Sequence, residues 1–191
     1  MTRLETLRLI LRNFEADDWR ALQEMTLQIE SSEYAAYDFA WPTSAEEIRG
    51  IAKWFASGDR YLAVCLQPTG RFIGSISLTQ AEKAAWVEFD LGYRFNFDYH
   101  GKGYATEGCQ AVIDHAFRQL AADRVTSGTA AANLPSCRLL QRLGMTKTGE
   151  STASFRKTSE GKPIEFVDFS FAITREEWLA RPHTPIAPTT H

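Results

Sequence analysis

Apolar residues at the start of the chain follow first the period of a strand and then the period of a helix. Leu7, Leu9 and Leu11 recur at every second position, which predicts a strand with one strongly apolar face. Asp17 and Asp18 then open a stretch with helical spacing, which predicts a helix. The apolar residues of this stretch are Trp19, Leu22, Met25 and Ile29.

Capping and turn residues mark a second helix and a β-hairpin further along. Ser44 and Glu47 have the spacing of a capping box and predict the start of a helix. The strand-like runs 61–66 and 72–78 are separated by the turn residues Pro68-Thr69-Gly70, so we expect them to pair as a hairpin. The apolar positions of the helix are Ile48, Ile51 and Trp54.

The second half of the chain alternates strands with helices around a segment that contains two glycines. A strand is expected over 86–95, and a helix follows the glycines with one apolar stripe. These elements predict an α/β (α+β) fold, with a mixed, mostly antiparallel central sheet flanked by helices. The stripe consists of Cys109, Val112, Ile113, Ala116, Phe117 and Leu120. The remaining expected elements are a strand at 124–130, a helix at 135–143 closed by Gly144, a strand at 166–173 and a helical turn capped by Thr174 and Glu177.

The length and composition favour one globular domain. With 191 residues, of which 44% are hydrophobic, the chain can bury one substantial core, so we expect a single domain over residues 1–180. The segment 181–191 contains three prolines and no periodicity, which predicts a disordered tail. No apolar run reaches the roughly 18 residues of a membrane span, and the N-terminus lacks the apolar block of a secretory signal. A cytoplasmic protein is therefore expected.

Charge and cysteine spacing argue against several classes of function. The formal net charge is −3 and no basic cluster stands out, which argues against a nucleic-acid partner. The three cysteines are widely spaced without a CxxC pattern, so we expect buried reduced thiols rather than disulfides or a zinc site. No metal is expected, because the histidines form no cluster either. The cysteines are Cys65, Cys109 and Cys137, and the histidines are His100, His115, His183 and His191.

The segment from Tyr99 to Ala105 is the most informative stretch for chemistry. Its two glycines allow a sharp turn and a close approach to a ligand, and the helix that follows offers unpaired N–H groups. These features predict a cradle for a diphosphate. The alternative is a loop that only turns the chain, since an isolated Gly-x-Gly is a weak signal. A triphosphatase loop and a dinucleotide-binding fingerprint are excluded, because their spacing and further required residues are missing.

The run His100-Gly101-Lys102-Gly103-Tyr104-Ala105 resembles the Gln/Arg-x-x-Gly-x-Gly/Ala signature of the GNAT superfamily of N-acetyltransferases. In that signature, successive backbone amides hold the pyrophosphate of coenzyme A. Continued through Thr106 and Glu107, the run is similar to the form in the RimJ/RimL-like branch of ribosomal-protein N-terminal acetyltransferases. His100 stands where Gln or Arg is usual, at a position that acts mainly through its backbone.

A second block of residues agrees with this resemblance. The run Asn133-Leu134-Pro135-Ser136, followed by Leu143-Gly144-Met145, resembles the Asn-x-x-Ser motif of the family and the end of its helix. The resemblance implies that Asn133 binds the pantetheine arm and that Ser136 lies near the thiol. Ordinary helix entry, with Asn133 as the cap, is the alternative. Three further segments look like the opening strand, central strand and closing segment of the RimJ/RimL-like branch: 6–12, 91–93 and 173–178.

The resemblance implies the GNAT acyl-CoA N-acyltransferase fold, acetyl-CoA as cosubstrate and direct attack of an amine on the thioester. Such an enzyme deprotonates an ammonium, stabilises an oxyanion and protonates the departing thiolate. Many members carry a Tyr where this chain has Leu140, so the resemblance implies Ser136 as the candidate acid. The alternatives are a hydroxyl that acts through water and a thiolate that leaves unassisted. The oxyanion amide is expected near Phe95. The other residues implied to bind coenzyme A are Asn96, Phe97, His100, Gly101, Lys102, Gly103, Tyr104, Ala105, Thr106 and Asn133.

Glu88 and Asp90 are the candidates for the general base. Both are expected on one face of the strand over 86–95, opposite Val87, Phe89 and Leu91. A carboxylate in a central strand is costly unless it faces a cleft or a partner. A salt-bridged or solvated carboxylate is the alternative interpretation.

The loop between the first two helices is expected to line the acceptor side, as it does in the superfamily. Its acids and aromatic rings would suit an ammonium group, and packing of the rings onto the core is the alternative. Arg156 and Asp168 match positions near the acceptor pocket of the RimJ/RimL-like branch, or they pair with each other. The candidate substrate-binding residues are Glu33, Tyr34, Tyr37, Trp41 and Arg156.

A protein N-terminal α-amine is the leading hypothesis for the acceptor. Small amines such as polyamines, amino acids or aminoglycosides are the alternative substrates. A non-catalytic module that binds coenzyme A is the alternative from another class of function, and a nucleotide-binding module is a weaker one. The expected assembly is a monomer or a homodimer, with neither nucleic acid nor membrane as a partner.

Overall fold

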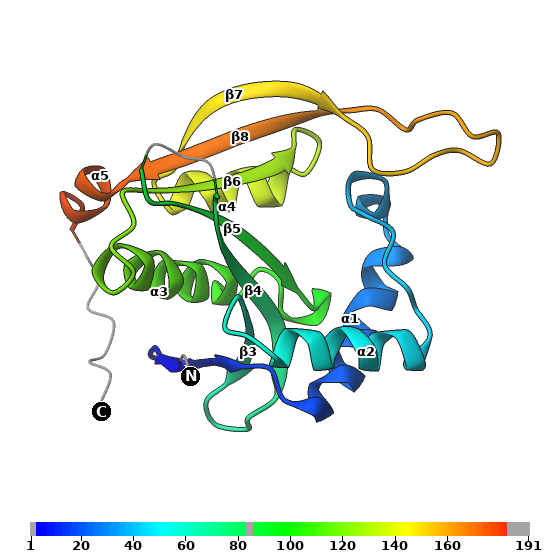
Figure 1. The fold of residues 1–191 in the computed structure, drawn as a ribbon, viewed down its shortest axis with the longest axis horizontal. Helices are drawn as coiled ribbons and strands as arrows, with labels where there is room; N and C mark the ends of the chain where they lie inside the picture. Colours follow the sequence, from blue (N-terminus) through cyan, green and yellow to red (C-terminus); the bar gives the residue numbers. More distant parts are fainter. Residues whose placement is uncertain (1–2, 83–85, 183–191) are drawn as a thin grey trace.

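The computed structural model describes residues 3–82 and 86–182, which form a mixed sheet of eight strands with helices packed against it (Figure 1). The strand order is β1-β2-β3-β4-β5-β6-β8-β7. Neighbouring strands are antiparallel except β5 and β6, which are parallel. This arrangement confirms the predicted fold class. The strands are β1 (Arg3–Glu5), β2 (Leu9–Asn13), β3 (Tyr61–Leu66), β4 (Phe72–Gln80), β5 (Glu88–Phe95), β6 (Arg124–Ala130), β7 (Thr146–Ala153) and β8 (Phe166–Thr174).

Helices cover both faces of the sheet. α3 (Tyr104–Arg118) and α4 (Leu134–Arg142) pack on one face, where the larger hydrophobic core lies. α1 (Trp19–Glu30) and α2 (Ala45–Ala56) enclose a second core with residues of β3 and β4. The remaining helical segments are α5 (Arg175–Leu179) and the 3-10 helices η1 (Ala16–Asp18), η2 (Glu33–Tyr37) and η3 (Phe97–Tyr99).

Local capping contacts start and end the helices where the sequence predicts. Ser44 precedes α2, and its Oγ accepts a hydrogen bond from the amide of Glu47 at 3.3 Å. Thr174 and Glu177 form a complete capping box at the start of α5. Gly144 follows α4 with a φ of 81°, a left-handed conformation that glycine adopts at little cost. Because each contact joins residues close in sequence, these boundaries were predictable.

Three apolar side chains that were expected on buried faces are exposed. Leu7 is 85% exposed, because the predicted first strand is interrupted between β1 and β2. Trp54 is 56% exposed, since α2 turns the neighbouring Phe55 into the core instead. Leu120 is 40% exposed because it lies beyond the end of α3. Periodicity therefore located these elements but misplaced residues at their ends and edges.

Periodicity did not predict β7. Most side chains of β7 are exposed, and the strand pairs only with β8 at the edge of the sheet. An edge strand that buries few side chains has no apolar alternation to detect. Its presence was decided by backbone pairing with β8.

The predicted tail falls mostly outside the described residues, which end at 182 and therefore leave out His183 and His191. Its first residue, Arg181, donates hydrogen bonds to the carbonyl of Leu143 and, at 3.0 Å, to the carbonyl of Arg142. The start of this segment is thus joined to the end of α4. Within the described ranges, no helix combines the length and apolar character needed to cross a membrane.

Candidate active site

β5 and β6 form a fork at the centre of the sheet. They pair only from Glu88–Arg124 to Asp90–Thr126, and the rest of each strand diverges (Figure 1). At the closed end, the Oγ of Ser127 donates a hydrogen bond to the carbonyl of Leu91 at 2.8 Å. The open part of the fork consists of residues 91–95 of β5 and 127–130 of β6.

Alternation along β5 directs specific backbone amides into this fork. The amide of Asn96, just after β5, donates to the carbonyl of Ile73, and the carbonyl of Glu88 accepts from the amide of Ala81. The backbone groups of even-numbered residues along β5 therefore form hydrogen bonds with β4. In an antiparallel ladder the residues between them point their N–H groups the other way. The amide of Phe95, the expected oxyanion donor, therefore faces the open fork.

The glycine segment after β5 leads into the start of α3, where backbone amides lack acceptors within the helix. Gly101 and Gly103 have φ values of 72° and 82°, which side chains rarely tolerate. The first hydrogen bond inside α3 joins the amide of Glu107 to the carbonyl of Gly103 at 3.0 Å. The amides of residues 104–106 precede that bond and have no acceptor within the helix. This geometry fits the predicted diphosphate cradle.

Arg8 is a basic residue of this site that sequence reasoning missed. Its Nη1 donates to the carbonyl of Lys102 at 2.9 Å, and its guanidinium lies 4.6 Å from the ring centre of Tyr104. The carboxylate of Glu107 holds Arg8 through its amide at 2.8 Å and its Nε at 2.7 Å. Thus Arg8 places a positive charge beside the glycine segment, from a distant part of the chain.

Three residues that were predicted to bind coenzyme A form hydrogen bonds within the protein. Asn96 is buried, and its side-chain amide donates to Glu24 of α1 at 2.9 Å. The amide of Phe97 donates to the side chain of Gln28 at 2.9 Å, so it is not free for a ligand. His100 directs its ring to the carbonyl of Phe95 at 3.0 Å. These contacts fix the loop against α1 and the end of β5.

The start of α4 brings the predicted Asn133 and Ser136 to the same fork. Asn133 caps the helix, because its Oδ1 accepts from the amide of Ser136 at 3.2 Å. The Oγ of Ser136 lies 2.6 Å from the hydroxyl of Tyr93 on β5. Leu140, at the position where many GNAT members carry Tyr, is fully buried in the larger core. The hydroxyl partner of Ser136 thus comes from a strand rather than from α4.

Burial sets the protonation state of Tyr93 and of the cysteines. Desolvation raises the pKa of Tyr93 far above its usual value, so its hydroxyl stays protonated. Burial also raises the pKa of Cys109 and Cys137, and that of Cys65 to about 11. The three cysteines are free and buried, as expected, and their thiols are protonated near neutral pH.

The two predicted carboxylates of β5 have different surroundings. Glu88 accepts a hydrogen bond from the indole of Trp86 at 3.1 Å and lies 3.5 Å from the guanidinium of Arg124. Asp90 is exposed and makes no such contact with the described residues. Partial desolvation and then the charge of Glu88 raise the pKa of Asp90. Asp90 is therefore the freer of the two carboxylates.

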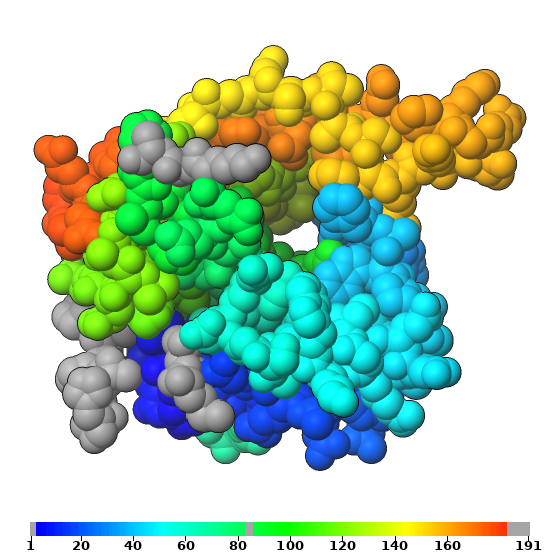
Figure 2. Space-filling model, in the orientation of Figure 1, coloured from blue at the N-terminus to red at the C-terminus, as the bar shows by residue number. Residues whose placement is uncertain are grey.

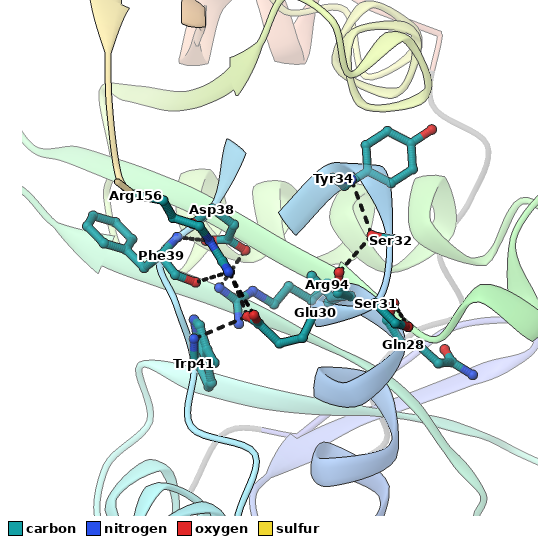
Figure 3. Close-up of polar contacts among 11 residues, drawn as sticks. Gln28, Glu30, Ser31, Ser32, Tyr34, Asp38, Phe39, Trp41, Arg94 and Arg156 are labelled. Atoms are coloured by element: carbon teal, nitrogen blue, oxygen red, sulfur yellow. Dashed lines mark hydrogen bonds and ion pairs between the residues drawn. The ribbon is translucent and has the colours of Figure 1, made fainter. Parts of the chain in front are cut away.

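On the acceptor side, acidic and basic residues neutralise each other (Figure 3). Arg156 binds both carboxylate oxygens of Glu30, at 2.7 and 2.8 Å. Its hydrogen bond to Glu30 is the main reason why the pKa of that carboxyl is lowered. Arg94 contacts Asp38 at 2.6 Å and lies 3.8 Å from the ring centre of Trp41. Arg156 and Asp168 therefore do not pair with each other, which corrects that alternative.

Aromatic rings line the same side. Tyr37 of η2 packs against Phe166 with ring centres 5.5 Å apart, and Phe39 packs against Phe155 at 4.2 Å. Tyr34 has its ring 6.4 Å from Phe97, whereas Glu33 is exposed. Figure 2 shows an opening through the molecule between the segment that follows α1 and the strands of the fork. The segment that follows α1 thus borders an opening, and two acids beside it, Glu30 and Asp38, are paired with arginines.

Among the described residues, no group of three or more His, Cys, Asp or Glu side chains could hold a metal ion. The site therefore consists of backbone amides, hydroxyls and carboxylates. These groups can bind a diphosphate at one end of the fork and move protons on either face of the sheet.

Comparison with known proteins relates this arrangement to acetyl transfer. Residues 8–146 match the family model described as "Acetyltransferase (GNAT) domain". The chain is 28% identical over 176 residues to YnaD of Bacillus subtilis, described as an uncharacterized N-acetyltransferase, covering 92% of this chain and 98% of that protein.

Solved structures share the fold over nearly the whole chain. The ribosomal-protein-S5-alanine acetyltransferase of Vibrio fischeri has a TM-score of 0.76 at 16% identity, with 95% of this chain and 100% of that chain covered. RimJ of Mycobacterium smegmatis, solved with CoA-disulfide, has a TM-score of 0.74 at 19% identity, with 94% and 88% covered. At these identities the likeness is one of fold.

Proposed function

Since this chain belongs to the GNAT acetyltransferase family, we propose that its acceptor is the α-amino group at the N-terminus of a protein. The family and its N-acetyltransferase relatives make the chain an enzyme that transfers an acetyl group from acetyl-CoA to an amine. The observation that carries the proposal is the open fork between β5 and β6, which joins the glycine segment to the acceptor side. The proposal also places the chain in the RimJ/RimL-like branch.

In this proposal the glycine segment and α4 hold acetyl-CoA. The free amides of residues 104–106 bind the pyrophosphate, Lys102 adds positive charge beside it, and the guanidinium of Arg8, which is paired with Glu107, contacts the same segment. Asn133 keeps its Nδ2 donor unused by the described residues, so it can bind the pantetheine arm in the fork. The amide of Phe95 stabilises the oxyanion, because it faces the same space.

The chemistry requires two proton transfers on opposite faces of the sheet. The acceptor nitrogen forms a bond to the acetyl carbon, and the C–S bond to coenzyme A breaks. Ser136, on the face covered by α3 and α4, protonates the departing thiolate. The amine loses its proton on the other face, where Asp90 rather than Glu88 is the unengaged carboxylate of β5.

The charge balance on the acceptor side supports a monocationic acceptor over a polycation. Glu30 and Asp38 are each paired with an arginine, so neither is free to bind an ammonium group, and the carboxylates left on this face, Asp90 and Asp168, lie on separate strands. This disfavours polyamines and aminoglycosides. The opening in Figure 2 suits an extended chain end, and the names of the Vibrio and Mycobacterium structures refer to ribosomal-protein acetyltransferases or RimJ. Amino acids are the second candidate acceptors, because they too carry one amine.

Thiol release from acetyl-CoA tests the proposal. We expect saturable release with peptides that begin with alanine or serine, and little release with polyamines, aminoglycosides or free amino acids. Peptides with an acetylated N-terminus serve as the matched control and should release no thiol. Turnover confined to a small amine, with no peptide accepted, would contradict the protein N-terminus as acceptor.

Loss of the Tyr93–Ser136 hydroxyl pair is expected to slow turnover without weakening acetyl-CoA binding. Ser136→Ala removes the acid, so we expect kcat to fall by about 100-fold, in the range found for general acids. Tyr93→Phe keeps the ring but leaves Ser136 without its 2.6 Å partner, and we expect about a tenfold fall. Because both variants disable one unit, the double variant should be no slower than Ser136→Ala.

Steady-state kinetics and a binding isotherm for acetyl-CoA check this expectation. Tyr61→Phe is the control, since Tyr61 packs on Phe55 in the second core. If the fall in kcat of the double variant equals the product of the falls in the two single variants, Tyr93 acts independently of Ser136.

A further inference from the structure

Asp168 is a half-buried carboxylate on β8 that faces the acceptor side of the sheet. Successive residues of a strand point to opposite faces. Phe169 and Phe171 belong to the larger core, so Asp168 lies on the other face. Phe166 shares this face and packs against Tyr37 of η2. Asp168 therefore points toward the region where we place the acceptor.

The described residues provide no hydrogen bond or ion pair for the Asp168 carboxylate. Arg156, which the sequence offered as its partner, is bound to Glu30. Burial accordingly raises the pKa of Asp168 above its ordinary value. An unpaired, partly desolvated carboxylate lowers stability, which points to a role in the reaction rather than in the fold.

Gly128 allows this carboxylate to lean over β6 toward the fork. A Cβ atom at Gly128 would lie 3.4 Å from Oδ2 of Asp168, so the carboxylate rests on the bare backbone of the neighbouring strand. Strand pairing sets its height along the fork. Asp168 lies opposite Ala130 of β6. Because β6 runs parallel to β5 with Thr126 opposite Asp90, Ala130, four residues further on, is level with Arg94. Asp168 is thus level with the open part of the fork.

Asp90, by contrast, lies at the closed end. It is five residues before Phe95, which corresponds to roughly 17 Å along a strand at about 3.3 Å per residue. A general base has to come within about 3 Å of its proton, directly or through one water. Asp168 is level with the open part of the fork and approaches it across β6, whereas Asp90 lies before the open part begins. If the Phe95 amide holds the oxyanion, this level favours Asp168 over Asp90.

We propose that Asp168 binds the ammonium group of the acceptor and receives its proton before attack. This inference rests on the proposed function and names the base within it. The ammonium gives one proton to Asp168, and the nitrogen lone pair then forms the C–N bond to the acetyl carbon. The C–S bond breaks, and the thiolate takes up one proton through Ser136. The nitrogen loses a second proton as the amide forms, and this loss equals the proton that the thiolate takes up. The proton on Asp168 passes to solvent.

The strand neighbours of Asp168 are uncharged, and the thiol near it stays protonated near neutral pH. Ala130 on β6 and Ser151 on β7 are its uncharged strand partners. Tyr37 of η2 packs against Phe166, which shares this face of β8 with Asp168. On α4, Cys137 is a buried thiol whose pKa is raised first by desolvation and also by the charge of Asp168. The pKa of Asp90 on β5 is raised as well, so a loss of activity at low pH is assigned to Asp168 only when Asp168→Asn removes it.

Kinetics of Asp168→Asn test the proposal. With an alanine-initial peptide, or the best amine of the acceptor panel, we expect kcat/KM to fall by about 100-fold. The dissociation constant for acetyl-CoA should stay within twofold. Activity of the wild type should decline as pH falls through the raised pKa of Asp168, and the variant should lose that decline. Asp17→Asn, the same change at an exposed position, is the control.

A second acceptor separates catalysis from a structural role. An aminooxyacetyl peptide is uncharged at neutral pH and needs no deprotonation before attack, so Asp168→Asn should slow it less than tenfold. The melting temperature at pH 7 should stay level or rise, because the variant removes an unpaired charge whose raised pKa makes the ionised form unfavourable in the folded state.

Two results would overturn the inference. One is wild-type kinetics in Asp168→Asn together with a 100-fold loss in Asp90→Asn, which would assign the base to β5. The other is an equal loss with both peptides. The proposed function is tested separately, by turnover of the wild-type enzyme on the peptide. The inference about Asp168 depends instead on the ratio of kcat/KM between Asp168→Asn and the wild type, measured with the same acceptor.

Discussion

Replacing Gly103 with Glu is expected to weaken acetyl-CoA binding by at least about 100-fold and to abolish turnover. Gly103 has a φ of 82°, which costs a residue with a side chain about 1 kcal/mol. The new carboxylate would also stand at the start of α3, where the free amides are proposed to hold two phosphates. Charge repulsion between the new carboxylate and the phosphates, together with steric displacement of the phosphates, would reduce the binding free energy by more than about 3 kcal/mol. That corresponds to roughly 100-fold in affinity.

Calorimetric titration with acetyl-CoA measures this loss directly. Gly161→Glu is the matched control, because Gly161 has a φ of 81° and no atom within 4 Å of the added Cβ. It carries the same backbone cost and the same charge, away from the glycine segment. Undiminished binding in Gly103→Glu would show that the pyrophosphate lies elsewhere.

Replacing Glu107 with Ala is expected to lower the free energy of unfolding by about 3 kcal/mol. Glu107 accepts hydrogen bonds from the hydroxyl of Thr6 at 2.6 Å and from the amide and Nε of Arg8. Thr6 is buried, so its hydroxyl would keep only the longer contact to the carbonyl of Leu9, at 3.4 Å, and the Arg8 amide would lose its carboxylate partner. Each unsatisfied group costs about 1–3 kcal/mol, and the partly exposed Arg8 side chain adds little.

Urea unfolding and melting temperature check this expectation. For a chain of this size, about 3 kcal/mol corresponds to a fall of roughly 6–12 °C. Glu107→Gln keeps an acceptor oxygen and should fall between the wild type and Glu107→Ala. Glu160→Ala, at an exposed position, should leave stability unchanged. A loss of less than about 0.5 kcal/mol in Glu107→Ala would mean that water replaces its contacts. Acetyl-CoA binding should weaken with stability, because Glu107 positions both α3 and Arg8.

Features that depend on neighbouring residues were predictable from the sequence. The hairpin of β3 and β4, the caps at Ser44 and Thr174 and the apolar stripe of α3 all follow from spacings of a few residues. The glycine segment belongs to the same class. A positive φ and a helix start that lacks acceptors are local properties, so the sequence could indicate an anion site before the fold was known.

Contacts between distant segments could not be predicted in the same way. Asp90 and Glu88 share a strand and a residue class, yet Arg124 of β6 engages only Glu88. A pair between Arg156 and Asp168 was one of two interpretations, but the segment between β7 and β8 places Arg156 against Glu30, 126 residues away in sequence. Such pairings depend on strand order and helix packing, which residue spacing does not encode.

The sequence by itself determined the order of most elements, the glycine turn before α3 and the Asn133 cap of α4, because short-range periodicity and backbone conformation specify them. The tertiary structure alone decided which groups from distant parts of the chain meet. It set Tyr93 against Ser136, 43 residues apart, and Arg8 against Glu107, 99 residues apart. It also laid Asp168 over Gly128. The physical reason is that strand register and core packing bring these side chains together, and both arise only when the whole sheet has formed.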